Sequence, residues 1–86
     1  MPIISSFFGI IIRMFYSDHA PPHFHAAYGE HELLVEISPI NILEGNAPAR
    51  VRSMVLEWAA MHQTELLEDW ERCQNAQTPF PIKPLE

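Results

Sequence analysis

Two closely spaced histidines are the residues of this chain best placed to do chemistry. Four of its five histidines lie in SDHAPPHFHAAYGEHEL, from Ser17 to Leu33, together with two prolines and three acids. His23 and His25 are separated by one residue, and residues two apart on a β-strand point to the same face. Both imidazoles could therefore serve one metal ion, one substrate or one interface.

Metal binding is the first interpretation of the pair. Neutral imidazoles are good ligands for transition metals, and Glu30, five residues after His25, adds a carboxylate. On this interpretation a divalent transition metal is bound by His23, His25 and Glu30. No other cofactor is indicated by the sequence.

Acid–base catalysis is the second interpretation. A strand face that carries His23 and His25 with Arg13 and Glu36 could remove a 2′-hydroxyl proton, stabilise phosphorane charge and protonate a leaving group. A metal-independent ribonuclease uses these functional groups. The net charge of -6 argues against nucleic acid as a partner, because phosphate backbones are bound by basic surfaces.

The third interpretation assigns the histidines no chemistry. His23 and His25 would then be partly exposed strand residues with one hydrogen bond each, in a turn or an oligomer interface. Asp18 would cap the loop that contains Pro21 and Pro22 through its carboxylate.

The first half of the chain is predicted to form an antiparallel meander of four to five strands over residues 3–44. β-Branched and aromatic residues alternate there with turn residues, and strands are rich in such side chains. The two prolines cannot donate to a ladder, so the third strand should begin only at His23. The expected strands start at Ile3 and cover 10–16, 23–28 and 31–38, with a less certain fifth strand over 40–45.

The second half is predicted to be helical over residues 47–76, as one long kinked helix or two consecutive helices. Asn46 is a suitable N-cap, with Pro48 in the first turn. A break is expected near Gln63 and Thr64, with Thr64 as a second N-cap. Spacings of three and four place a stripe of residues against the sheet, namely Val51, Val55, Trp58, His62 and Leu66.

Together these elements predict a two-layer α+β fold and a single domain over residues 1–86. The proline-rich segment 77–86 should lie extended on the surface, anchored by Phe80, Ile82 or Leu85. The lone Cys73 indicates an intracellular protein that does not depend on disulfides. Arg13 interrupts the apolar N-terminal stretch well short of a membrane span, so we expect a cytoplasmic protein with no membrane partner.

Strand alternation also predicts the composition of the sheet face away from the helices. Phe24 should face the helices, which sends His23 and His25 outward. Apolar side chains would frame them there, and such a face suggests a second protein chain or a ligand. The expected binding residues are Asp18, His19 and Tyr28 with the apolar Ile11, Phe15 and Leu34.

The chain resembles a family of short bacterial and archaeal proteins of unknown function. Four segments carry the resemblance: FFGIIIRMFYSDHAPPHFHAAYGEHE, ILEGNAPAR, VLEWAAMHQTELLEDWE and IKPLE. The resemblance covers nearly the whole chain and is most specific in the block DHxPPHFHAxYGE. It implies a gene often placed beside that of a second small uncharacterised protein, as in toxin–antitoxin pairs. It implies no reaction or cofactor. By position it points to Asp18, His19, Pro21, Pro22, His23, His25, Tyr28, Gly29 and Glu30, and in the helices to Trp58, His62, Glu65, Leu66 and Trp70.

The leading hypothesis from the sequence is a protein-interaction component of a toxin–antitoxin-like two-gene module. It would bind the product of the adjacent gene, or a second copy of itself, through the outer sheet face and the His-Phe-His block. Whether the protein is an enzyme stays open at this point.

Overall fold

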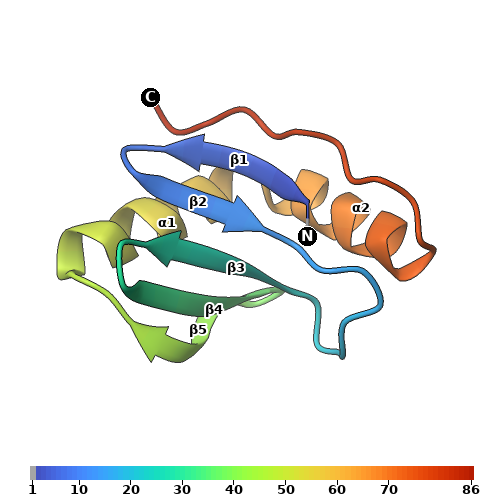
Figure 1. The fold of residues 1–86 in the computed structure, drawn as a ribbon, viewed down its shortest axis with the longest axis horizontal. Coiled ribbons are helices and arrows are strands. Elements are labelled where there is room, and N and C mark those ends of the chain that lie inside the picture. The colour runs from blue at the N-terminus through green and yellow to red at the C-terminus, as the bar shows by residue number, and fades with distance from the viewer. Residues whose placement is uncertain (1) are drawn as a thin grey trace.

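Five strands and two helices make up the computed structural model, which describes residues 2–86. The strands form one antiparallel sheet in the order β1-β2-β3-β4-β5, and both helices lie on the same face of it (Figure 1). The predicted two-layer α+β meander is therefore confirmed. The elements are β1 Ile3–Phe7, β2 Ile10–Arg13, β3 His23–Tyr28, β4 His31–Ile37, β5 Ile40–Asn46, α1 Ala49–Met61 and α2 Gln63–Gln74.

Burial alternates along the three central strands, as expected for a sheet covered on one face. Ile10 and Ile12 of β2, and Phe24 of β3, are fully buried under the helices. The residues between them face the other way and are partly exposed. The strand register places Arg13, His25, Leu34 and Glu44 in one row across β2, β3, β4 and β5 on this outer face.

The pairing of β4 with β5 contains a bulge next to Leu34 and Val35. Gly45 lies there with φ +93°, in the left-handed region that favours glycine. A Cβ at this position would stand 2.0 Å from the carbonyl oxygen of Glu32. Only glycine allows this close approach of the two backbones.

The first helix begins later than predicted. Asn46 is the last residue of β5, and the N-cap of α1 is Pro48, which makes no side-chain capping bond. The Asn46 Oδ1 instead accepts from the backbone N–H of Ala47 at 2.9 Å and from Arg52 Nη1 at 3.2 Å. Asn46 therefore stabilises the turn out of the sheet, and its assignment as N-cap was wrong.

A break divides the helical half at His62, one residue before the predicted position. His62 ends α1 and caps α2, so the assignment of Thr64 as second N-cap was wrong. The His62 Nδ1 lies 2.5 Å from Glu65 Oε1 in the first turn of α2, where an acid also suits the helix dipole.

Among residues 2–86, which the structure describes, neither helix is long and apolar enough to cross a membrane.

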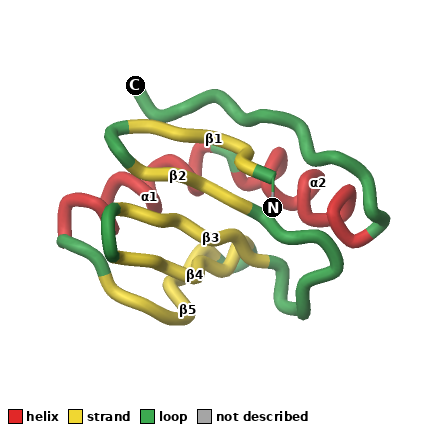
Figure 2. Tube along the Cα trace, in the orientation of Figure 1, coloured by secondary structure: helices red, strands yellow, loops and turns green. Residues whose placement is uncertain are grey.

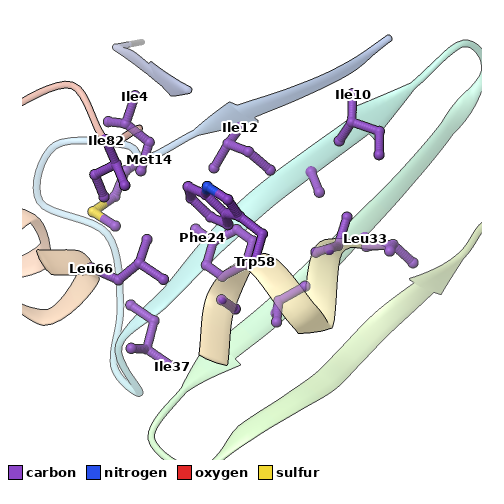
Figure 3. Packing of buried hydrophobic residues seen from close by; sticks show 14 of the residues in the cluster. Ile4, Ile10, Ile12, Met14, Phe24, Leu33, Ile37, Trp58, Leu66 and Ile82 are labelled. Atoms are coloured by element: carbon purple, nitrogen blue, oxygen red, sulfur yellow. The ribbon is translucent and has the colours of Figure 1, made fainter. Parts of the chain in front are cut away.

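Trp58 lies at the centre of the core, surrounded by side chains from both layers (Figure 3). Its ring packs edge-on against Phe24 at 5.7 Å and tilted against Phe7 at 5.4 Å between ring centroids. The predicted stripe is buried at Val51, Val55, Trp58 and Leu66. His62 was expected in that stripe but is only half-buried at its edge.

The C-terminal segment runs extended past β1 and α2 (Figure 2). Of the three predicted anchors, Ile82 is buried, Leu85 is half-buried and Phe80 is 58% exposed. The Ile82 N–H donates to the Ile4 carbonyl at 2.7 Å, and Trp58 Nε1 donates to the Lys83 carbonyl at 2.9 Å. Of the three alternatives, Ile82 is therefore the main anchor, and Phe80 is not one.

Candidate functional site

The Asp18 carboxylate contacts both imidazoles of the His-Phe-His block. Its Oδ2 lies 2.9 Å from His23 Nε2 and 3.5 Å from His25 Nε2. His23 and His25 come from the start of β3, whereas Asp18 comes from the loop between β2 and β3. Strand and loop together bring three potential ligands to one point.

The two histidines share the outer face, on the side opposite Phe24, but differ in exposure. His25 is half-buried, with its ring edge-on to Phe15 at 4.3 Å between centroids. His23, which was expected to point outward, is only 5% exposed. The ring of Trp70, from α2, packs against it with 5.1 Å between the ring centroids, at the first residue of β3.

The second nitrogen of each imidazole also faces an oxygen. His23 Nδ1 lies 2.8 Å from the Pro21 carbonyl oxygen, which can only accept a hydrogen bond. His25 Nδ1 lies 3.7 Å from Glu32 Oε2, a longer contact at the exposed rim. Both rings are thus oriented with Nε2 turned toward the same carboxylate oxygen. Metal-binding histidines often donate their other N–H to a carbonyl or carboxylate in this way.

Competing effects act on the Asp18 carboxyl. Its partial burial raises the pKa, but the backbone N–H of His19, which donates to Oδ1 at 2.8 Å, and the contacts with His23 and His25 outweigh burial. The pKa is lowered overall. Asp18 is therefore a carboxylate at neutral pH, the form that binds metal ions.

The three donor atoms fit a transition metal ion. Asp18, His23 and His25 each offer one ligand atom, and these atoms lie within 4.8 Å of one another. Ligands bound to zinc at ordinary lengths of about 2.1 Å stand about 3.0 to 3.4 Å apart. Asp18 Oδ2 lies 2.9 Å from His23 Nε2 and 3.5 Å from His25 Nε2, each within about 0.1 Å of that range. Two histidines and one carboxylate are also the ligands of many non-haem iron sites.

A pocket of about 690 Å³ opens on the outer sheet face beside these three residues. Leu34 and Leu43 contribute apolar surface to it, and Glu32 and Glu44 contribute carboxylates. Its lining contains no lysine or arginine. The lining residues are Asp18, His19, Ala20, Pro21, His23, His25, Glu32, Leu34, Leu43, Glu44 and Gly45.

The predicted metal ligand Glu30 does not take part in this group. It is exposed in the turn after β3, whereas His23 begins that strand, so the length of β3 separates them. Asp18 stands in its place. The sequence had placed Asp18 among the expected binding residues, and as a cap of the loop in the third interpretation, but not among the metal ligands.

The residues predicted for acid–base chemistry flank the site without joining it. Arg13 lies opposite His25 and Glu36 lies opposite His23 in the strand register, and both are half-buried. Over residues 2–86, neither Arg13 nor Glu36 makes a side-chain hydrogen bond or ion pair to an imidazole.

The predicted binding residues divide into two groups. His19 lines the pocket beside the ligands, with Phe15 against His25 and Leu34 in the pocket wall. Tyr28 lies at the other end of β3. Ile11 is half-buried on β2.

Three residues near the site had no part in the site predicted from the sequence, although the family resemblance named Trp70. Glu32, which lines the pocket, was given no role. Trp70 and Gln74 lie about fifty residues away along the chain, and their helical spacing says only that they share a side of α2. No sequence signal could place them beside the β2–β3 loop.

The fold and site define a small α+β protein with a histidine and carboxylate cluster on the uncovered face of its sheet. The chain belongs to the family described as Domain of unknown function (DUF4160), whose family model matches residues 9–71. That range includes the whole cluster, and the match confirms the predicted membership of a family of unknown function over residues 9–71. Comparisons with curated proteins and with solved structures gave no match.

Proposed function

We propose that this protein binds a divalent transition metal ion through Asp18, His23 and His25 and uses it on a ligand held in the outer-face pocket. The observation that carries the proposal is the convergence of three donors within 4.8 Å of one another. The Pro21 carbonyl reinforces it, because His23 Nδ1 must keep its hydrogen there, which leaves the Nε2 lone pair for the ion.

The position of the pocket favours a reactive site over a structural one. Structural zinc sites are closed by four protein ligands, whereas catalytic sites have three and keep a position open. Here three ligands lie in the wall of an open pocket. When bound, such an ion supplies Lewis acidity or an activated water. Glu32 and Glu44 in the lining disfavour polyanions such as RNA.

The geometry favours metal binding over a metal-independent ribonuclease. That mechanism requires an imidazole free to exchange protons with substrate and a cation beside it to stabilise phosphorane charge. The Nε2 atoms of His23 and His25 both face Asp18 instead. The cation predicted for this role, Arg13, contacts neither ring within the described part of the chain.

Metal analysis of protein purified without an affinity tag tests the proposal. We expect one equivalent of metal per chain after titration with Zn²⁺ or Co²⁺, and loss of binding in His25→Ala. His31→Ala is the matched control, because His31 is exposed at the far end of the β3–β4 hairpin. Equal binding by both variants, or binding weaker than millimolar in the wild type, would contradict the proposal.

A second candidate function is the partner-binding role in a toxin–antitoxin-like two-gene module. It is favoured by the half-buried Ile11, Phe15 and Leu34 and the exposed Leu43, which give the outer face an apolar character beside the pocket. Co-expression with the adjacent gene product tests it. We expect a complex that Ile11→Lys disrupts, because Ile11 lies on this face but outside the pocket lining. Light scattering that shows only a monomer, with no complex captured, would remove this candidate.

A further inference from the structure

The last turn of α2 holds the loop that carries Asp18. Gln74 Nε2 donates to the Asp18 backbone carbonyl at 3.0 Å, and the Ser17 N–H donates to the Cys73 carbonyl at 3.3 Å. The end of α2 and the β2–β3 loop lie at the same end of the molecule (Figure 1). Two hydrogen bonds from one helical turn thus fix two consecutive loop residues.

Asp18 depends on such support more than the histidines do. His23 and His25 are placed by a strand that is paired on both sides. Asp18 lies in a loop, so the position of its carboxylate depends on the conformation of the loop backbone. Ser17 has φ +53°, a left-handed conformation that is unfavourable for a non-glycine residue. Surrounding contacts must hold the loop in that conformation.

We propose that Gln74 is a positioning residue of the metal site, acting through the Asp18 backbone. This inference rests on the proposed metal-binding function. Gln74 does not belong to the ligand group, and its side-chain amide reaches only the carbonyl of the ligand residue. Loss of an interaction that orients a metal ligand typically lowers affinity 10- to 100-fold. The C-terminal turn of α2 would thereby set both the affinity and the geometry of the site.

Gln74 also offers a clean experiment, because its side chain is exposed and contributes nothing to the core. Gln74→Met keeps the length of the side chain and removes its N–H donors. Gln63→Met is the matched control: Gln63 Nε2 donates to the Ile37 carbonyl at 2.7 Å, the same kind of bond made from the other end of α2. Each variant loses one amide-to-carbonyl bond, and only one of these bonds reaches a ligand residue.

Titration of the metal-free full-length variants with Co²⁺, followed by visible absorption, measures both affinity and geometry. For Gln74→Met we expect Co²⁺ affinity to fall 10- to 100-fold and the d–d bands to shift or change intensity. For Gln63→Met we expect an affinity within about twofold of the wild type and an unchanged spectrum. Urea unfolding of the metal-free proteins verifies that both variants are folded.

The outcomes separate this inference from the function on which it rests. A wild type that binds no Co²⁺ overturns the metal site itself. A wild type that binds Co²⁺, with Gln74→Met unchanged in affinity and spectrum, overturns the positioning role and leaves the metal site intact. Equal losses in Gln74→Met and Gln63→Met would also overturn it, because the effect would then be one of general stability.

Discussion

Asp18 Oδ2 lies 2.9 Å from His23 Nε2, while the other nitrogen of the same ring faces the Pro21 carbonyl. One imidazole is therefore held between a loop carboxylate and the backbone of that same loop. Burial by Trp70 fixes the ring further. The loop between β2 and β3 thus contributes one ligand residue, Asp18, and also orients the His23 ring.

Carboxylate-to-amide substitutions distinguish the observed ligand set from the one expected from sequence. We expect Asp18→Asn to weaken Zn²⁺ binding at least 100-fold, because the amide removes the charged ligand with little change in shape. Glu30→Gln should leave binding within about twofold, since Glu30 is exposed in the turn after β3. Competition with a chromogenic chelator measures both. A greater loss in Glu30→Gln would show that the third ligand is misassigned.

Because β5 approaches β4 closely at Gly45, this is the glycine at which substitution should destabilise the fold most. Gly45→Ala should lower the free energy of unfolding by about 2 to 4 kcal/mol, because the methyl group meets the Glu32 carbonyl and φ is positive. Gly29→Ala, also at positive φ but with no atom within 4 Å of the new methyl, should cost only about 1 to 2 kcal/mol. Urea denaturation measures the two values. Equal costs would contradict the steric argument.

Ile82 should be the side chain of the C-terminal segment that contributes most to its attachment. We expect Ile82→Ala to destabilise the fold by about 2 to 4 kcal/mol, because Ile82 is 4% exposed within the core. Phe80→Ala should cost less than about 1 kcal/mol: the ring is 58% exposed and loses mainly its contact with the Arg72 guanidinium, 4.0 Å away. Thermal and urea unfolding check this order. A larger effect at Phe80 would reverse the assignment of the anchor.

The raised pKa of Asp69 should make the free energy of unfolding fall as pH rises. The lowered pKa of Asp18 acts in the opposite direction. Its side chain is buried, Oδ1 accepts from the Phe80 N–H at 2.9 Å, and Oδ2 has no partner in the described part of the chain. Burial raises its pKa and prevails over the Phe80 N–H and Arg72, which lower it. The folded state therefore holds this proton more tightly than the unfolded chain, and this contribution to stability is lost as pH rises.

Asp69→Asn isolates that effect, because the amide has no proton to lose in this range. We expect the stability of the variant relative to the wild type to rise by about 1 to 3 kcal/mol between low pH and pH 7, because only the wild type must bury a charged carboxylate at the higher pH. The gain should shrink as pH falls and vanish where the carboxyl is protonated in both the folded and the unfolded state. Urea unfolding at both pH values measures it. A gain that is constant with pH would contradict the role of the proton.

The fold was predictable because its signals are local. Alternation along β3 and β4 and the helical spacing of Val55 and Trp58 each depend on nearby residues, and they gave the meander and the helical layer correctly. The capping assignments of Asn46 and Thr64 failed because the same residue types also stabilise strand ends and turns. Local pattern cannot distinguish those uses.

The candidate site was predictable only where it follows strand periodicity. That periodicity placed His23 and His25 on one face, but it could not say that the preceding loop folds back to bring in Asp18. The burial of His23 depends on Trp70, which belongs to a different element. The bond from Gln74 joins residues 56 positions apart in the chain. These features come from tertiary packing, which one sequence without aligned relatives does not reveal.

The path of the C-terminal segment has a consequence for self-association. β1 and β5 are the two edge strands of the sheet, and the segment that contains Ile82 runs beside β1. Growth of a sheet from molecule to molecule needs an open edge on both sides, since each new copy must offer a fresh edge to the next. With one edge shielded, pairing through β5 closes on itself as a twofold dimer and ends there. We therefore expect the C-terminal segment to limit growth of the sheet by strand addition at β1.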